Sequence, residues 1–144
     1  MIKQFQEEYR WLSNMEPCNI EMEGVIYPSV EHAYMSAKSL DPLWKDFCIS
    51  TVSPYTVKKQ SKFIKLRSDW EYIKKSVMLH CLEQKYRQEP YMSKLIATGD
   101  VHIQEGNNWK DIFWGIDLET EKGQNTLGIM IMNIRTELQN LTQI

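Results

Sequence analysis

Helix-start signals recur through the middle of the chain, and they limit it to a helix-rich fold. Ser29 precedes a segment with helical apolar spacing, Asp41-Pro42 ends that segment and starts the next, and Ser53-Pro54 starts a third. Small polar side chains cap helix N-termini, and proline is favoured in the first helical turn. The pattern predicts helices over residues 29–40, from residue 42, and over 54–64.

The remaining segments mix further helices with short strands. Glu23-Gly24 separates the extended segments 18–22 and 25–27, which predicts a hairpin. Helices are predicted over 70–87 with Asp69 as the cap, after Pro90, and over 126–141. Short strands are predicted over 101–104 and 112–114.

Strands do not alternate with helices in the manner of a parallel βαβ fold, and neither GxGxxG nor GxxxxGK[ST] occurs. We therefore expect an α+β fold, a helix-rich single domain over residues 1–144 with a small antiparallel sheet. A Rossmann or P-loop nucleotide site is disfavoured.

Composition is ordinary for a globular chain, with 42% hydrophobic and 25% charged residues. No run approaches the roughly 18 apolar residues of a membrane span, and the N-terminus lacks a secretory apolar core. Three widely spaced cysteines without a CxxC pair predict reduced thiols and a cytoplasmic location. The three histidines form no zinc motif, so we expect neither metal nor cofactor.

Charge is unevenly spread along the chain. No acidic residue occurs between Asp46 and Asp69, whereas this stretch contains Lys58, Lys62 and Lys65. Acidic residues predominate over 100–121. The bland explanation is a solvated helix beside a solvated loop; the alternative is a site that binds phosphate at one end and performs acid–base chemistry at the other. The net charge of −2 disfavours tight binding to duplex DNA.

Two charged residues flank the apolar stripe of the segment YPSVEHAYMSAK, residues 27–38. With Ser29 as the cap, Glu31 falls at the second helical position, where the helix dipole favours an ionised carboxylate. Lys38 is then about 20° away around the axis and roughly 10 Å along it, too far for a salt bridge. Either Glu31 by itself stabilises the helix start, or Glu31 and Lys38 flank a ligand that lies over Tyr34 and Met35.

Two later segments have side chains suited to ligand binding. EGNNWKDIFWG, residues 105–115, combines amides with Trp109 and Trp114, a combination that grips flat rings, although both tryptophans are equally compatible with a core role. GQNTLG, residues 123–128, starts the last helix with Asn125 or Thr126 and is suited either to a phosphate or simply to helix initiation. We expect these clusters to converge on one cleft.

The motifs and their order resemble the NADAR superfamily, the NAD- and ADP-ribose-associated domain that includes YbiA-like N-glycosidases. The matching segments are YRWLSNM (9–15), YPSVEHAYMSAK (27–38), RSDW (67–70), ATGDVHIQEGNNWKDIFWG (97–115) and GQNTLGIMIMNIRTEL (123–138). The resemblance implies a helix-rich α+β fold that hydrolyses an N-glycosidic bond to ribose. The substrates it implies are phosphorylated ribosylaminopyrimidine intermediates of riboflavin synthesis, or ADP-ribose conjugates such as ADP-ribosylated guanine in nucleic acid.

The resemblance also implies site residues. Its acidic residues fall on Glu31 and Asp111, and its lysine falls on Lys38. The predicted substrate-binding residues are Asn14, Tyr34, Trp109, Trp114, Asn125, Arg10 and Lys62. Relatives often carry Gln where this chain has Met35, which puts one ribose or base contact in doubt.

Hydrolysis of a ribose C–N bond passes through an oxocarbenium-like state that needs a negative charge and a base for water. Glu31 and Asp111 supply these roles in either order. Lys38 either binds a ribose hydroxyl or phosphate, or attacks the opened sugar as an amine. A non-catalytic sensor of ADP-ribose or NAD is the alternative function. A binder of an anion has little need for both carboxylates, which favours the enzyme.

Overall fold

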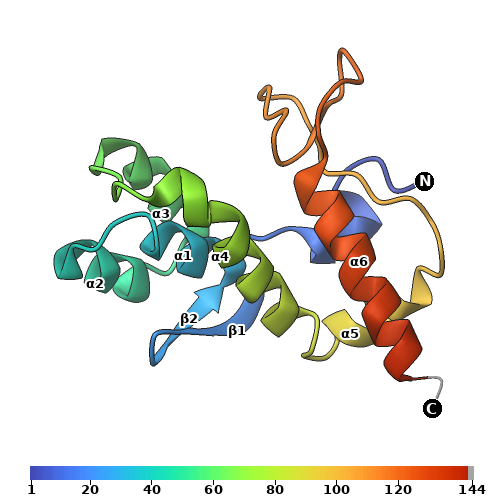
Figure 1. Ribbon diagram of the computed structural model, residues 1–144, viewed down its shortest axis with the longest axis horizontal. Helices are drawn as coiled ribbons and strands as arrows, with labels where there is room; N and C mark the ends of the chain where they lie inside the picture. The colour runs from blue at the N-terminus through green and yellow to red at the C-terminus, as the bar shows by residue number, and fades with distance from the viewer. Residues whose placement is uncertain (143–144) are drawn as a thin grey trace. The chain divides into compact units, whose positions relative to one another are not determined.

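The computed structural model describes residues 1–142, which form two compact units (Figure 1). The central unit, residues 14–88, contains the β1–β2 hairpin and helices α1 to α4. The terminal unit joins residues 1–13 to the chain from residue 89 onward and contains α5, α6 and a second pair of strands. Residues 143 and 144 of the predicted domain lie outside the described residues.

Capping side chains start the first three helices of the central unit as predicted. Ser29 accepts a hydrogen bond from the N–H of His32, Asp41 from that of Leu43, and Ser53 from that of Thr56. The helices that follow are α1 (Val30–Ser36), α2 (Pro42–Ser50), α3 (Pro54–Gln60), the 3-10 helix η2 (Ser61–Phe63) and α4 (Trp70–Lys85).

The first and third of these helices are shorter than the sequence predicted. Helix α1 ends at Ser36, so Leu40 is not part of its buried face and is exposed. Helix α3 ends at Gln60, and a 3-10 turn covers part of the remaining predicted segment. The Lys38 carbonyl accepts a hydrogen bond from the N–H of Arg67 at 2.8 Å, which ties the chain after α1 to the segment before α4.

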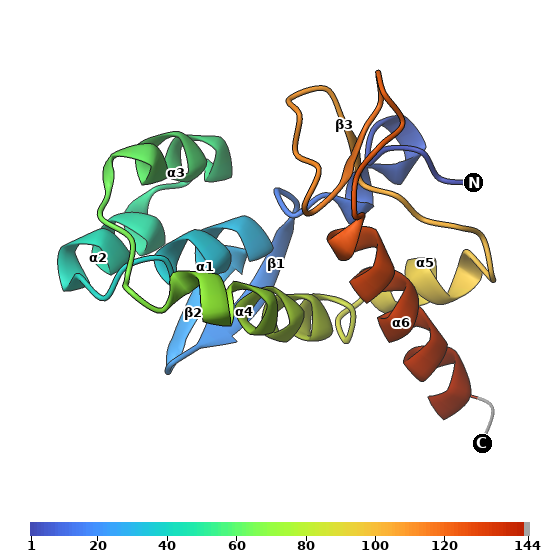
Figure 2. The same ribbon diagram turned by 45° about the horizontal axis from the view of Figure 1, so that its top comes forward.

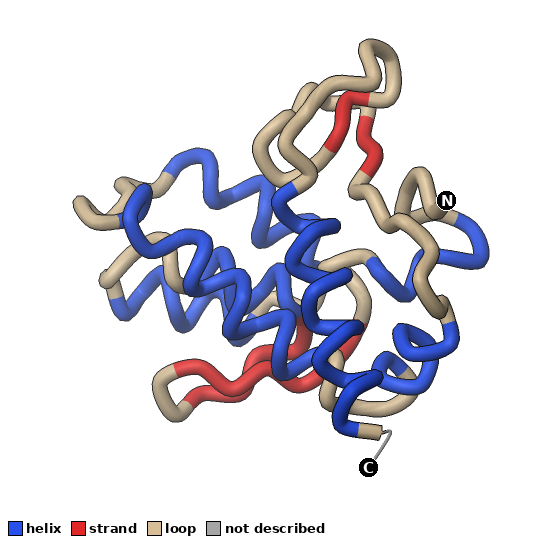
Figure 3. Tube along the Cα trace, turned by 45° about the vertical axis from the view of Figure 1, so that its right-hand side comes forward, coloured by secondary structure: helices blue, strands red, loops and turns tan. Residues whose placement is uncertain are grey.

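The predicted hairpin is confirmed. Strands β1 (Pro17–Met22) and β2 (Val25–Ser29) pair antiparallel, with Ile20 opposite Tyr27 (Figure 3). Both of these side chains are buried. Gly24 forms the turn with a φ of 80°, a backbone conformation that favours glycine.

Helix α1 is buried on every side. It packs against the hairpin and against α2, α3 and α4, and each of its residues is buried. A helix enclosed in this way is normally apolar all round. Helix α1 instead carries Glu31 and His32 into the interior, and this exception marks the candidate site.

The terminal unit is organised around its last helix. Its elements are the 3-10 helix η1 (Glu7–Leu12), α5 (Tyr91–Ala97), β3 (Gly106–Asn107), β4 (Ile116–Asp117) and α6 (Thr126–Leu141). Leu127, Ile131, Ile134 and Leu138 of α6 are buried as predicted, whereas Leu141 is exposed. The periodic face of α6 therefore supplies the core of this unit except at its last turn.

The two strands predicted in this unit are wrong. The named strands are instead β3 and β4, which run parallel with Gly106 opposite Ile116. Of residues 101–104, only Ile103 pairs, in an isolated parallel bridge with Ile2. The carbonyls of Ile112, Phe113 and Trp114 accept N–H groups from residues 124, 126 and 127, so they serve the start of α6 rather than a strand partner. Figure 2 shows this orange segment folding back over the beginning of α6.

Asp69 does not cap α4 as predicted. No side-chain bond closes the start of this helix. The Asp69 carboxylate instead accepts hydrogen bonds from Nε of Arg67 at 2.6 Å and from Nη2 of the same guanidinium at 3.1 Å.

No helix within residues 1–142 has the length and apolar character needed to cross a membrane.

Lys85 provides a test of the central unit's core. Its side chain is fully buried, and this burial lowers the pKa of its ammonium to about 7, against opposing effects of Cys18 and Glu16. Between pH 7 and the ordinary lysine pKa the unfolded chain holds a proton that the folded chain has released. The free energy of unfolding therefore rises with pH across this window. Below the window, the full cost of burying the Lys85 ammonium charge lowers the stability of the folded protein.

Replacing Lys85 with Met removes this titration. We expect the free energy of unfolding of Lys85→Met to exceed that of the wild type most at pH 7 or below. The difference should shrink by roughly 3 kcal/mol on going to about pH 9.5. Urea unfolding of both proteins at the two pH values measures it, and a difference that does not change with pH would contradict the burial argument.

Candidate functional site

The start of α1 places a carboxyl group in the interior of the central unit. Glu31 is the second residue of α1, as predicted from Ser29, and only 6% of it is exposed. Its backbone N–H donates to the carbonyl of Asn14 at 3.0 Å. The first turn of the helix is thus held by Ser29 on one side and by Asn14 on the other.

Two lysines act on the Glu31 carboxyl. Burial raises its pKa, and the nearby charges of Lys58 and Lys38 lower it without cancelling the effect of burial. The sequence predicted an ionised carboxylate favoured by the helix N-terminus. In the structure, loss of water around the charged form has the largest effect on the Glu31 pKa and raises it, so the ionised form is less favoured than the sequence predicted.

Lys38 lies just beyond the C-cap of α1. Its Nζ is 5.7 Å from the centre of the Tyr34 ring. Burial lowers the pKa of Lys38, Glu31 raises it, and the positive charges of Lys58 and Lys74 lower it further. Glu31 and Lys38 therefore interact even though they do not form the regular helical pair that their spacing had excluded.

Aromatic rings line the same region. The rings of Tyr34 and Trp70 lie 5.1 Å apart at an angle of 57°, and both residues are buried. Met35, predicted with Tyr34 to lie under a ligand, is also buried. Tyr34 and Met35 are thus part of the packed interior, with Tyr34 against the first residue of α4.

Asn14 has an amide oxygen that is available to a donor. Its Oδ1 is buried and has no hydrogen-bond partner among the described residues, while its Nδ2 is 3.7 Å from the sulfur of Met78. A buried amide oxygen without a partner is rare and costly. Because the carbonyl of Asn14 holds the N–H of Glu31, this group belongs to the same corner of the unit as the carboxyl.

Lys58 is the site residue that the sequence ranked too low. Lys58 and Lys62 were predicted to share one face, and Lys62 was selected for substrate binding. Lys62 lies in η2 and is exposed. Lys58 of α3, by contrast, is the lysine whose charge lowers the pKa of Glu31 the most. Helical spacing alone could not tell which of the two lysines faces α1.

A second polar group is built within the terminal unit around Asn107. This buried side chain donates from Nδ2 to Glu105 Oε2 at 3.0 Å and to the carbonyl of Asp111 at 2.9 Å. Its Oδ1 accepts the N–H groups of Asp111 at 3.0 Å and Trp109 at 3.3 Å. Asn107 therefore holds the loop 105–111 in one conformation.

Asp111 continues this network. Its Oδ1 accepts the backbone N–H groups of Phe113 at 3.2 Å and Trp114 at 2.9 Å. The rings of Phe113 and Trp114 are nearly parallel, with centres 4.8 Å apart. Trp109 is 56% exposed. One oxygen of the predicted catalytic carboxylate thus shapes the loop that presents the aromatic rings.

Asn125 precedes α6 in a left-handed conformation with a φ of 53°. Its Oδ1 accepts the N–H of Glu105, and its Nδ2 donates to the carbonyl of Ile103, each at 3.0 Å. The N–H groups of residues 124–127 are also bound to carbonyls of residues 112–115. These bonds occupy the N–H groups of residues 124–127 within the unit, and the role of this helix start in ligand binding stays a prediction.

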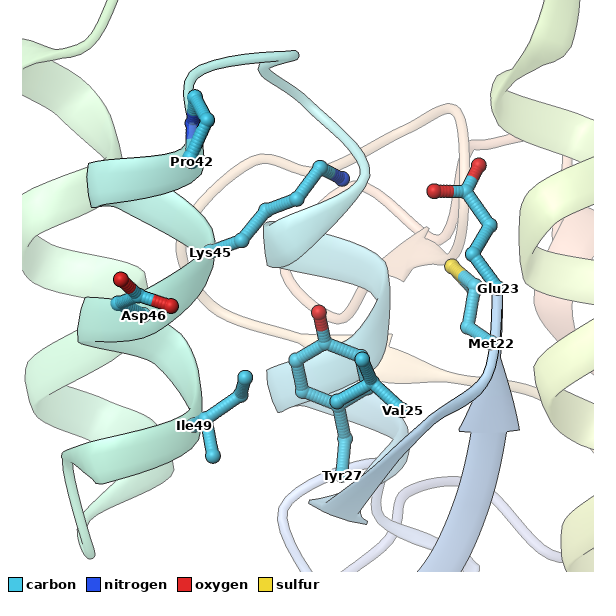
Figure 4. Close-up of a pocket in the computed structure, with 8 residues that line it drawn as sticks. All are labelled: Met22, Glu23, Val25, Tyr27, Pro42, Lys45, Asp46 and Ile49. Carbon is cyan, nitrogen blue, oxygen red and sulfur yellow. The ribbon is translucent and has the colours of Figure 1, made fainter.

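A separate cavity of about 210 Å³ lies between the hairpin and α2 (Figure 4). Figure 4 shows the Tyr27 ring at its centre, with Lys45 and Glu23 on opposite sides. Its lining residues are Met22, Glu23, Val25, Tyr27, Pro42, Lys45, Asp46 and Ile49. The Lys45 ammonium donates to the carbonyl of Ser36 at 3.2 Å. None of the predicted site residues lines this cavity.

The predicted residues thus fall into two groups, each described within its own unit. Asn14, Glu31, Tyr34, Lys38 and Lys62 belong to the central unit, and the cluster of Glu31, Lys38 and Lys58 is its candidate site. Arg10 of η1, Trp109, Asp111, Trp114 and Asn125 belong to the terminal unit. The single cleft expected from the sequence stays a prediction.

Within residues 1–142, no group of three or more His, Cys, Asp or Glu side chains is placed to hold a metal ion.

Comparison with known proteins defines the class. The model of the NADAR domain matches residues 2–139. The solution NMR structure of Escherichia coli YbiA superposes with a TM-score of 0.83 at 25% identity, covering 99% of this chain and 89% of that one. The protein is thus a helix-rich α+β protein with the YbiA-like fold, as predicted. The chain belongs to the NADAR family.

Relatives with assigned names are of two kinds. The N-glycosidase YbiA of Escherichia coli K12 is 29% identical over 135 residues, which cover 92% of this chain and 83% of that protein. An N-glycosidase of Nostoc punctiforme is 27% identical, with 96% and 91% covered. A riboflavin biosynthesis protein of Vibrio vulnificus is 33% identical over 136 residues, which cover 92% of this chain but only 36% of that longer protein.

The bonds around Asp111 separate its structural from its chemical role. Asp111→Ala removes the acceptor for two backbone N–H groups, and we expect it to lower the free energy of unfolding by about 1–3 kcal/mol. Asp111→Asn keeps an acceptor oxygen and should stay within about 0.5 kcal/mol of the wild type. Urea unfolding measures both; equal losses in the two variants would show that the negative charge, and not the acceptor, holds the loop.

Proposed function

We propose that this protein hydrolyses the C–N bond between a ribose and a base. Its class, a hydrolase acting on N-glycosyl bonds, follows from membership of the NADAR family and from relatives of similar length that are named N-glycosidases. The proposed catalytic residues in the central unit are Glu31 and Lys38, and Lys58 joins them. Asp111 stays a predicted catalytic residue.

The observation that carries the proposal is the buried carboxyl of Glu31 among lysines. A carboxyl whose pKa is raised by burial exchanges protons closer to neutral pH than an exposed one does. Lys58 and Lys38 limit this rise and so keep the ionised form accessible. Buried ionisable groups with shifted pKa values cluster at functional sites, because burying a charge costs a fold stability.

The sequence left two assignments of the carboxylates open, and the burial of Glu31 supports one of them. In this assignment Glu31 accepts a proton from the attacking water. The water oxygen bonds to the anomeric carbon as the C–N bond breaks, and the bonding electrons leave with the base. The base nitrogen takes up a proton from solvent, and Glu31 returns to solvent the proton that it accepted. In this assignment the role of stabilising the oxocarbenium-like state falls to the other predicted carboxylate, Asp111.

Lys38 has two open roles in the proposal. Its lowered pKa supports the role of an amine nucleophile, because more of the neutral form is present near neutral pH. Ring opening would leave the anomeric carbon as an imine of the base nitrogen. The lysine amine would add to this carbon, the base would leave as its free amine, and water would later hydrolyse the lysine imine to the aldehyde. In the other role the charged ammonium binds a ribose hydroxyl or a phosphate.

The substrate is a phosphorylated ribosyl compound. We favour ADP-ribosylated guanine or a related ADP-ribose conjugate, because the segment between residues 54 and 67 is basic and exposes Lys59, Lys62 and Lys65. Intermediates of riboflavin synthesis are the second candidate, and the naming of a Vibrio relative for riboflavin biosynthesis favours them. The amide oxygen of Asn14 would accept a hydrogen bond from such a ligand.

The free thiols of Cys18, Cys48 and Cys81 support a cytoplasmic location.

Product release tests the function. The wild type and Glu31→Gln are incubated with an ADP-ribosylated guanine oligonucleotide and, separately, with a phosphorylated ribosylaminopyrimidine, and free base is measured by mass spectrometry. We expect release from one of the two substrates by the wild type, reduced at least about 100-fold in Glu31→Gln. Glu83→Gln makes the same chemical change on α4, outside the lysine cluster, and should retain full activity.

Release that survives in Glu31→Gln would contradict the catalytic role of the carboxyl. The absence of release from both substrates, together with ADP-ribose binding by calorimetry, would instead establish the sensor alternative. In that case Glu31 would be a buried charge that serves ligand binding alone.

Arginine can replace Lys38 if the residue binds the substrate, but not if it acts as a nucleophile. An arginine side chain keeps the positive charge but lacks a nucleophilic amine. We expect Lys38→Arg to lose at least about 100-fold in turnover, and wild-type protein reduced with borohydride during turnover to gain the mass of the sugar fragment. Retention of most activity in Lys38→Arg, with no adduct in the wild type, would assign Lys38 to binding.

A further inference from the structure

His32, the residue after Glu31, has a buried ring with a hydrogen bond at each nitrogen. The residue is 1% exposed. Its Nε2 lies 2.8 Å from the backbone carbonyl oxygen of Thr51, and its Nδ1 lies 2.7 Å from Oγ of Ser29. Neither the sequence motifs nor the proposed chemistry had given this side chain a role.

The partners determine which nitrogen carries hydrogen. A carbonyl oxygen can only accept, so Nε2 is the donor to Thr51. In the neutral ring Nδ1 is then an acceptor, and the Ser29 hydroxyl donates to it. The same Ser29 oxygen accepts the backbone N–H of His32 at 3.0 Å. Ser29 and His32 thus satisfy each other's polar groups and form a rigid start to α1.

Thr51 stands where two helices meet. Its N–H ends α2 by donating to the carbonyl of Phe47 at 3.0 Å, and Ser53, shortly after it, caps α3. Helix α3 carries Lys58 and packs against α1. The bond from His32 to Thr51 therefore ties the helix that carries Glu31 to the junction from which the helix with Lys58 begins.

We propose that His32 is a positioning residue that, through Thr51, holds α3 against the start of α1 and so keeps Lys58 beside Glu31. A histidine suits this task because one ring reaches two partners on opposite sides and buries no unsatisfied group. An apolar residue of similar size would fill the space but leave the Thr51 carbonyl without its donor. The effect on turnover rests on the proposed function, whereas the effect on Glu31 does not.

Two substitutions separate the two ends of the ring. The amide of His32→Gln reaches the Nε2 position and can still donate to Thr51, whereas the shorter amide of His32→Asn reaches only toward Ser29. The titration of the Glu31 carboxyl is followed by ¹³C NMR in the wild type, in both variants, in Lys58→Met and in the double variant His32→Asn/Lys58→Met.

We expect Lys58→Met to raise the pKa of Glu31, because Lys58 lowers it in the wild type. His32→Asn should raise the Glu31 pKa in the same direction, His32→Gln should stay near the wild type, and the double variant should titrate as Lys58→Met does. A Glu31 titration unchanged by His32→Asn, or shifted equally with and without Lys58, would overturn the proposal.

Two further measurements keep the outcome independent of folding and of activity. Long-range ¹H–¹⁵N spectra of the wild type should show hydrogen on Nε2 of His32, and an Nε2 without hydrogen would overturn the proposal without any variant. Where turnover is measurable, His32→Asn should lower kcat and His32→Gln should restore it. If the wild type cleaves neither substrate, the proposed function fails while the NMR result still decides the role of His32.

Discussion

Burial of the Glu31 carboxyl is the interaction around which the central unit is arranged. Taking a carboxylate out of water costs free energy, and here the cost is only partly offset by Lys58 and Lys38. The hairpin, α2, α3 and α4 all pack against α1, so the charge cannot escape to solvent by a local shift. Two neighbouring segments contribute to the cluster: α3 brings Lys58, and the segment before α4 holds the backbone of Lys38 through Arg67.

The polar residues of the terminal unit serve a different purpose. Asn107 and Asn125 use both ends of their side chains within the unit, and one oxygen of Asp111 binds two backbone N–H groups. A loop so rich in polar groups is stable only when those groups are satisfied. The network thereby holds the aromatic rings of residues 109–114 in place, with Trp109 exposed.

Local signals in the sequence predicted much of the fold, because caps and prolines act within a single turn. Ser29, Asp41 and Ser53 start helices as expected, and Glu23-Gly24 forms the hairpin turn. The strand over 112–114 was wrong because the carbonyls of these residues bind the start of α6, a partner that no local pattern indicates. Of residues 101–104, only Ile103 pairs, in a single bridge with Ile2. Asp69 failed as a cap because the Arg67 guanidinium takes its carboxylate.

The candidate site was predictable in its residue types but not in its electrostatics. Spacing placed Glu31 at the second position of α1, yet full enclosure of that helix, and with it the raised pKa of Glu31, depends on four packed elements. The choice of Lys58 over Lys62 depends on how α3 faces α1. The bonds of His32 join residues 29, 32 and 51 across two helices, and no motif signals such a link.

The most direct test of the account is a crystal structure of Glu31→Gln with the uncleaved ribosyl substrate bound. The account predicts that the anomeric carbon lies against the side chain at position 31, with Lys38 and Lys58 close to the sugar or its phosphate. A substrate bound in the cavity between the hairpin and α2, with position 31 untouched, would contradict it.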